Sequence, residues 1–149
     1  MSFKSSKGFT IIELLVVVAI IAVLAAIVLV NVTGYINQGK NAAVKGNLAT
    51  VLTNAAVWYD GVGLGSYTGF CASTNFTTPS AAISAAGETA ICDELAAGTR
   101  WCACSSLKTT GTEGADATFC VDSTGYKKVS DTTVGCAARC STPDGACID

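Results

Sequence analysis

The sequence predicts an α+β fold in which one long N-terminal helix packs against a small, disulfide-stapled antiparallel sheet. An apolar, helix-like run begins at Phe9 and continues as an amphipathic pattern to about Tyr59, and short strand-like runs follow after residue 98. All eight cysteines of the 149-residue chain lie after residue 70. An even number of cysteines in a small domain with few large apolar side chains is typical of a disulfide framework formed in an oxidising compartment.

The first half of the predicted helix is apolar on every side. No charged residue occurs between Glu13 and Lys40, and the run Leu14–Val32 has about nineteen residues, the length that one membrane-spanning helix needs. A cleaved secretory signal is the rival interpretation, but its apolar region would have only about 7–15 residues. Because Lys4 and Lys7 precede the run, we expect a cytoplasmic N-terminus, with the cysteines on the opposite, oxidising side.

The second half of the predicted helix has a single apolar stripe. Its apolar residues recur at three- and four-residue spacing, while amide and basic side chains occupy the other faces. Gly61, Gly63 and Gly65 end the pattern. We therefore expect one helix from about Phe9 to about Tyr59, roughly 75 Å long, whose second half packs on the C-terminal domain. The stripe comprises Val44, Leu48, Val51 or Leu52, Ala55 and Trp58, and the other faces hold Asn41, Lys45, Asn47 and Asn54.

The C-terminal part is predicted to contain short helical pieces followed by strands. The helical pieces are expected at Ala81–Ala86 and Thr89–Ala97. Strand signals follow at Thr99–Leu107 and Ala117–Ser123, which flank a polar stretch and predict a hairpin with a long loop. Tyr126–Ser130 is a third strand candidate after a turn.

The cysteines are predicted to form disulfides rather than a zinc site. The chain has no histidine, and the spacings of its cysteines do not match a usual zinc site. Cys102 and Cys104 stand two apart on a predicted strand, so they face the same side and should not bond to each other. The connectivity is open, and we predict Cys104–Cys120 across the hairpin and Cys136–Cys147 around the tail. The disulfide candidates are Cys71, Cys92, Cys102, Cys104, Cys120, Cys136, Cys140 and Cys147.

Composition argues against several functional classes. A net charge of −2 with scattered basic residues predicts no nucleic-acid-binding face. A chain without histidine has no Ser/His/Asp or Cys/His catalytic arrangement. Carboxylates such as Asp122, Asp131, Asp144 and Asp149 are not spaced as a calcium-binding loop. We therefore predict that the protein is not an enzyme and has no cofactor and no metal site.

The stretch KGFTIIE, Lys7 to Glu13, together with the uncharged apolar run that follows, resembles the N-terminus of type IV pilins and the related pseudopilins. The resemblance covers about residues 5–35 and combines a short basic leader, a Gly-Phe junction, a glutamate at the fifth position after the junction and a long apolar helix. It implies that a prepilin peptidase cuts between Gly8 and Phe9 and that the new Phe9 amine is N-methylated. Where many pilins carry a helix-opening proline, this chain has Val30.

The resemblance also implies four segments and a role for Glu13. The segments are a leader peptide (1–8), an apolar transmembrane and filament-core helix (9–33), its amphipathic continuation (34–60) and a cysteine-rich head (61–149). A carboxylate near the bilayer centre costs about 3 kcal/mol by insertion scales, but Glu13 lies about 7 Å along the mature helix and so nearer the interface. In related filaments this glutamate is thought to pair with the N-terminal amine of a neighbouring subunit, which sets register more than it stabilises. The competing interpretation is an isolated carboxylate with no partner.

The function implied by the resemblance is that of a structural subunit of a type IV pilus-like filament. Its precursor would cross the inner (cytoplasmic) membrane once, and the mature chain would join an extracellular homo-oligomeric pilus. The implied partners are other pilin subunits, prepilin peptidase and the assembly machinery, and no nucleic acid is implied. The alternatives are a minor tip pilin that binds surfaces or DNA, a type II secretion pseudopilin, or a plain single-pass membrane protein.

Overall fold

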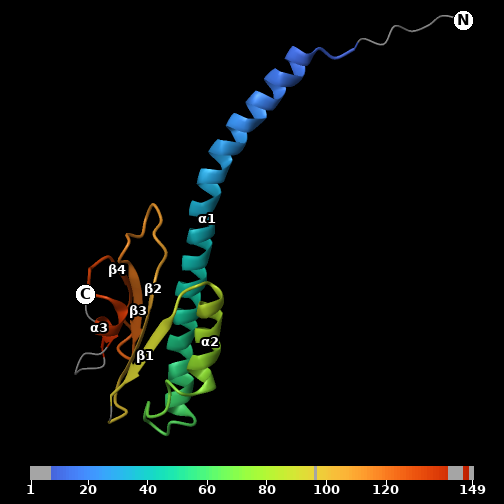
Figure 1. Ribbon diagram of the computed structural model, residues 1–149. Helices are drawn as coiled ribbons and strands as arrows, with labels where there is room; N and C mark the ends of the chain where they lie inside the picture. The colour runs from blue at the N-terminus through green and yellow to red at the C-terminus, as the bar shows by residue number, and fades with distance from the viewer. Residues whose placement is uncertain (1–7, 96, 141–145, 148–149) are drawn as a thin grey trace, which may run out of the picture. The chain divides into compact units, whose positions relative to one another are not determined.

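The computed structural model describes residues 8–95, 97–140 and 146–147 (Figure 1). Its elements, in chain order, are α1 (Ile11–Asp60), α2 (Thr74–Ala85), β1 (Ala90–Glu94), β2 (Trp101–Ser106), β3 (Thr118–Asp122), β4 (Lys127–Ser130) and α3 (Cys136–Cys140). The chain divides into two compact units between Tyr35 and Ile36, and each is described by itself. The α+β, disulfide-stapled fold predicted from the sequence is confirmed.

The first unit contains the N-terminal part of α1. The helix begins at Ile11, has 50 residues and continues through position 30, as the lack of a proline there predicts. Large apolar side chains between residues 9 and 29 are 48–84% exposed in the single chain and cover every side of the helix. By length and composition, α1 is able to cross a membrane.

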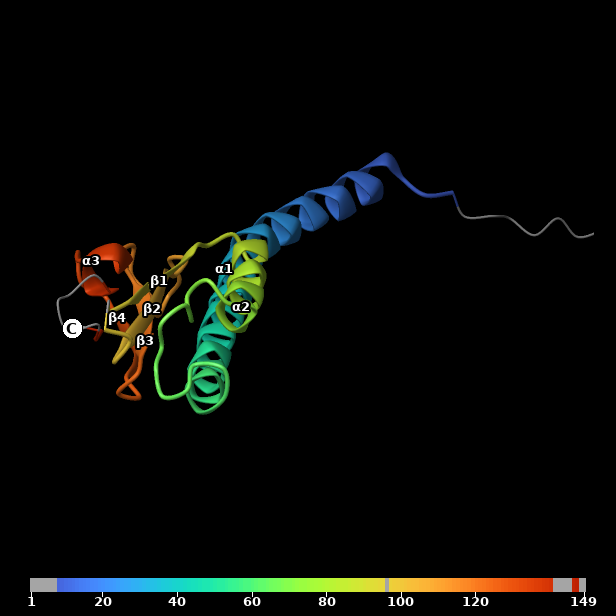
Figure 2. The ribbon, with the colours of Figure 1, turned by 90° about the horizontal axis from the view of Figure 1, so that it is seen from below.

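The second unit is a three-layer arrangement around an antiparallel sheet of order β1-β2-β3-β4. The later part of α1 and α2 lie on one face of this sheet, and α3 lies on the other (Figures 1 and 2). Successive side chains of a strand point to opposite faces, so Trp101 and Ala103 join the core beneath the helices, while Cys102 and Cys104 join a cysteine cluster on the α3 side. Every residue of β3 is buried for the same reason.

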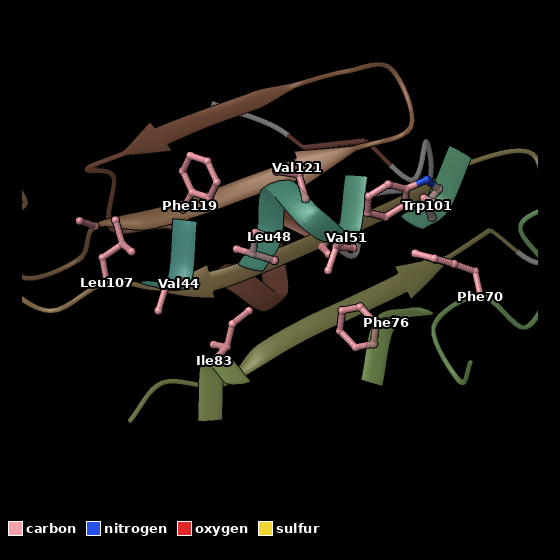
Figure 3. Packing of buried hydrophobic residues seen from close by; sticks show 13 residues of the cluster. Val44, Leu48, Val51, Phe70, Phe76, Ile83, Trp101, Leu107, Phe119 and Val121 are labelled. Atoms are coloured by element: carbon pink, nitrogen blue, oxygen red, sulfur yellow. The ribbon is translucent and has the colours of Figure 1, made fainter. Parts of the chain in front are cut away.

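The apolar stripe predicted on the second half of the helix forms the centre of the core. Val44, Leu48 and Val51 are 0% exposed and Ala55 is 1% exposed. Figure 3 shows Val44, Leu48 and Val51 of α1 in one cluster with Phe119 and Val121 of the sheet. Leu52 and Trp58 are partly buried against the same cluster. The other buried members of this core are Phe70, Phe76, Ile83, Trp101, Ala103, Leu107 and Ala117.

Three predicted strands are confirmed as β2, β3 and β4, but the helical pieces before them are placed differently. The expected helix at Thr89–Ala97 is wrong, because Ala90–Glu94 forms strand β1, with residue 96 outside the described residues. β1 pairs antiparallel with β2 from Ala90↔Ser105 to Glu94↔Trp101. Pairing with the next strand, β2, decided the conformation here, over a weak local preference. The other expected piece is the end of α2, which begins earlier, at Thr74.

One polar residue assigned to an outer face of the helix is buried instead. Asn41 is 1% exposed and lies one turn before Val44 on the core side. Its Nδ2 donates to the Lys108 carbonyl at 2.7 Å, and the Lys108 N–H donates to Asn41 Oδ1 at 2.7 Å. The amide thus pairs with a backbone as a neighbouring strand would, which satisfies its polar atoms. This contact holds the β2–β3 loop against α1.

An ion pair holds the same loop at a second point. Lys45 Nζ lies 2.5 Å from Glu113 Oε1, and Thr112 Oγ1 donates to Glu113 Oε2 at 2.7 Å. Thr110 Oγ1 also donates to Glu113 Oε2. The Lys45 ammonium, and after it the two threonine hydroxyls, lower the pKa of Glu113 from 4.5 to about 2. The loop is therefore joined to α1 by charge as well as by hydrogen bonds.

Candidate assembly site

The N-terminus of α1 carries a capping arrangement between Thr10 and Glu13, directly after Gly8 and Phe9 in the chain. Thr10 directly precedes the first helical residue, and its backbone N–H and Oγ1 donate to Glu13 Oε2 at 2.9 and 2.8 Å. The Glu13 N–H donates back to Thr10 Oγ1 at 3.3 Å. This reciprocal pattern is a capping box, in which a Thr and a Glu three residues apart satisfy the first free N–H groups of a helix. The Thr-x-x-Glu spacing alone could have predicted this cap, although it was not used for a prediction.

In the single chain, the Glu13 carboxylate takes part in the capping box. Thr10 binds this carboxylate, and the pairing of Glu13 with an amine of a neighbouring subunit stays a prediction. Both contacts fall on Oε2, and Oε1 makes no hydrogen bond to any described residue. One carboxylate oxygen is therefore committed to the start of the helix, and the other is open to a cation from outside the chain.

The junction before the capping box is accessible. Phe9 is 81% exposed, and a Cβ added to Gly8 would meet nothing within 4 Å. An enzyme that cuts a peptide bond needs close access to the backbone, which a glycine in open surroundings provides. The site thus presents an accessible Gly8–Phe9 bond, about five turns of exposed apolar helix from Ile11 to Leu29, and one acidic oxygen.

Comparison with known proteins agrees with this geometry. Residues 3–29 match the prokaryotic N-terminal methylation motif. The chain is also 49% identical, over 46 residues, to a protein named type IV major alpha-pilin from Moraxella bovis. The N-terminal segment is therefore similar to that of type IV pilins. The pilin match covers 31% of this chain and 29% of the relative's length, and no solved structure matches the chain.

The cysteine-rich head is stapled by four disulfides that join all eight cysteines. The predicted Cys104–Cys120 and Cys136–Cys147 bonds are both wrong. The bonds, with their Cα–Cα distances, are Cys71–Cys92 (5.7 Å), Cys102–Cys140 (5.5 Å), Cys104–Cys136 (5.5 Å) and Cys120–Cys147 (6.1 Å).

The pairings were wrong because the sequence did not reveal that α3 and the tail lie on the same face of the sheet as these cysteines. Cys104 and Cys120 are register partners on β2 and β3, as the hairpin predicts. Both face the α3 side, where Cys136 of α3 and Cys147 of the tail bond to them. The expectation that Cys102 and Cys104 share one side of the sheet without bonding to each other is confirmed.

The aspartates considered for calcium have structural roles where they are described. Asp122 Oδ1 accepts from the Thr124 N–H at 2.8 Å, and its Oδ2 accepts from the Cys147 N–H at 2.8 Å. Asp131 Oδ1 accepts from the Gly114 N–H at 2.9 Å. Asp144 and Asp149 lie outside the described residues. Asp122 therefore closes a turn and holds Cys147, and Asp131 binds the β2–β3 loop at Gly114.

Proposed function

We propose that the protein is the structural subunit of a type IV pilus-like filament, assembled through residues 9–33. One observation carries the proposal: the methylation motif leads into a helix whose apolar side chains are exposed on every side and whose Glu13 retains an open carboxylate oxygen. A helix that is apolar all round requires lipid or other apolar helices around it. Before assembly the lipid is the inner membrane, and afterwards the surroundings are helices of other copies.

When the helix leaves lipid for a filament, the favourable free energy comes from close packing between helices, since lipid tails are as apolar as leucine. Such packing alone is tolerant of axial sliding, because Val, Leu and Ile repeat along the whole segment. A single acidic oxygen near one end removes that tolerance, because it is satisfied only where a cation lies at the same height. Cleavage between Gly8 and Phe9 would create such a cation, the Phe9 amine, and N-methylation would keep its charge. Glu13 would then set the register of each incoming subunit.

Substitution of Glu13 separates this role from helix capping. Glu13→Gln keeps an oxygen that caps at the same position but carries no charge, whereas Glu13→Ala removes both. If Glu13 pairs with an amine, both variants are cut and inserted normally, and both lose surface filaments. If Glu13 only caps, Glu13→Gln assembles like the wild type and Glu13→Ala is the weaker variant. The measurement is the filament mass sheared from cells relative to membrane-bound subunit, and normal Glu13→Gln filaments would sink the register role.

Processing has its own measurement. The intact mass and first residue of filament protein should show a chain that starts at N-methylated Phe9. A chain that retains residues 1–8 would instead favour a plain single-pass membrane protein. The relative is named a major pilin, and we extend that role to this chain: it should dominate sheared fibres by mass, whereas a minor tip pilin would be a trace component.

A further inference from the structure

Two disulfides on the α3 side of the sheet touch each other through their sulfur atoms. Cys102 Sγ lies 3.5 Å from Cys120 Sγ and 3.4 Å from Cys147 Sγ, although Cys102 is bonded to Cys140 and Cys120 to Cys147. The sulfurs of Cys102, Cys120 and Cys140 all lie within 4.8 Å of one another. We call the Sγ atoms of Cys102, Cys120, Cys140 and Cys147 the sulfur cluster. Because every sulfur in it is already bonded, the cluster has no thiolate to offer a metal.

The two bonds of the sulfur cluster differ in their access to solvent. Cys102, Cys120 and Cys140 are each 0% exposed, whereas Cys147 is partly exposed. A reductant in solution therefore reaches the cluster at Cys147 and not at the Cys102–Cys140 bond. Attack on the Cys147 sulfur releases Cys120 as the thiolate, which remains in place because Cys120 sits on the buried strand β3.

We propose that reduction of Cys120–Cys147 is passed inward by disulfide exchange, so that α3 loses a covalent tie that solvent does not reach. In the first step a phosphine or dithiol attacks Cys147 Sγ, and the Cys120–Cys147 bond breaks with its electron pair on Cys120. The phosphine ends as its oxide, with oxygen from water, or the dithiol as its own disulfide, and Cys147 ends as a thiol. In the second step the Cys120 thiolate attacks Cys102 Sγ, a Cys102–Cys120 bond forms, and the Cys102–Cys140 bond breaks. Its electron pair leaves on Cys140, which takes a proton from water. The second step involves no net oxidation or reduction.

The exchange moves the reduced state from the strand to the outer layer. After it, β2 and β3 are joined by Cys102–Cys120, and the free thiols belong to Cys140 on α3 and Cys147 in the tail. Of the three bonds on this side of the sheet, Cys104–Cys136 alone would still tie α3 to the sheet. Reduction at the sulfur cluster therefore loosens the attachment of α3 to the sheet. This inference does not depend on how the N-terminal helix assembles.

The test is trapping of free thiols in the full-length protein in detergent. The protein is treated with limiting tris(2-carboxyethyl)phosphine, alkylated with N-ethylmaleimide at about pH 8 or about pH 3, and mapped by peptide mass spectrometry. The thiolate that carries out exchange is about 10⁵-fold less populated at the lower pH. At the higher pH we expect label on Cys140 and Cys147 with a Cys102–Cys120 cross-link. At the lower pH we expect label on Cys120 and Cys147 with Cys102–Cys140 intact.

Two controls make the result decisive. The buried Cys104–Cys136 bond is an internal reference for direct reduction and should stay unlabelled at both pH values. The double variant Cys120→Ser with Cys147→Ser lacks the thiolate, so its Cys140 should stay unlabelled under the same treatment. Label on Cys120 and Cys147 without label on Cys140 at both pH values would overturn the proposal, as would label on Cys140 in the double variant.

Discussion

Replacement of Asn41 by leucine tests whether the β2–β3 loop is held to α1 by side-chain pairing with a backbone. Leucine has the branched shape of asparagine and none of its polar atoms. Asn41→Leu removes two hydrogen bonds of 2.7 Å each and leaves the Lys108 N–H and C=O facing an apolar side chain. Each lost bond costs about 0.5–1.5 kcal/mol, and an unpaired buried group costs about 1–3 kcal/mol.

Partial exposure of Lys108 limits that cost, because water reaches part of the loop. We therefore expect the variant to lose about 2–3 kcal/mol of unfolding free energy. For a unit of this size, about 4 °C of melting temperature corresponds to 1 kcal/mol, which gives a fall of about 8–12 °C. The assay is thermal unfolding of the full chain in detergent, followed by near-ultraviolet circular dichroism. Trp58 and Trp101, the two tryptophans of the chain, both lie in the second unit and report on it.

The matched control is Asn47→Leu, the same substitution on the same helix. Asn47 donates to the Ala43 carbonyl of its own helix, so its loss should change the unfolding free energy by less than about 0.5 kcal/mol. If Asn41→Leu melted within about 2 °C of the wild type, the reasoning would be refuted. Water would then satisfy the Lys108 backbone as well as Asn41 does.

Two further predictions concern the head. Glu113→Gln should destabilise the second unit by about 1 kcal/mol at neutral pH, because its partner Lys45 is partly exposed. The depressed pKa of Glu113 means that this contribution is full above pH 4.5 and disappears as the pH falls through about 2. Melting curves of variant and wild type should thus differ at pH 7 and converge near pH 2, and curves that coincide at pH 7 would contradict the assignment. Removal of the Cys71–Cys92 bond by serine at both positions should cost about 3 kcal/mol, because the bond closes a loop across 21 positions. Glu94 still accepts from the Gly69 and Cys71 amides in that variant, so a loss below about 1 kcal/mol would show that the loop is ordered without the bond.

Much of the fold was predictable because its signals are local. The helix from residue 11 to residue 60 follows from an uninterrupted apolar run and then a stripe at three- and four-residue spacing. Strands β2, β3 and β4 follow from short β-favouring runs separated by turns. The cleavage junction at Gly8–Phe9 and the assembly role of Glu13 are predictions from local sequence, and the capping contact between Thr10 and Glu13 could be predicted from their spacing.

The sequence by itself determined the long helix, its apolar stripe, the hairpin and the N-terminal motif, because each depends on residues close together in the chain. Only the tertiary structure decided that Ala90–Glu94 is a strand, that Asn41 is buried and which cysteines are bonded. A strand with weak preference is fixed by its partner, and a polar side chain enters a core when a distant backbone satisfies it. A disulfide forms only where folding brings two Cα atoms within about 6 Å, and α3 and the tail supply partners that spacing along the chain does not disclose.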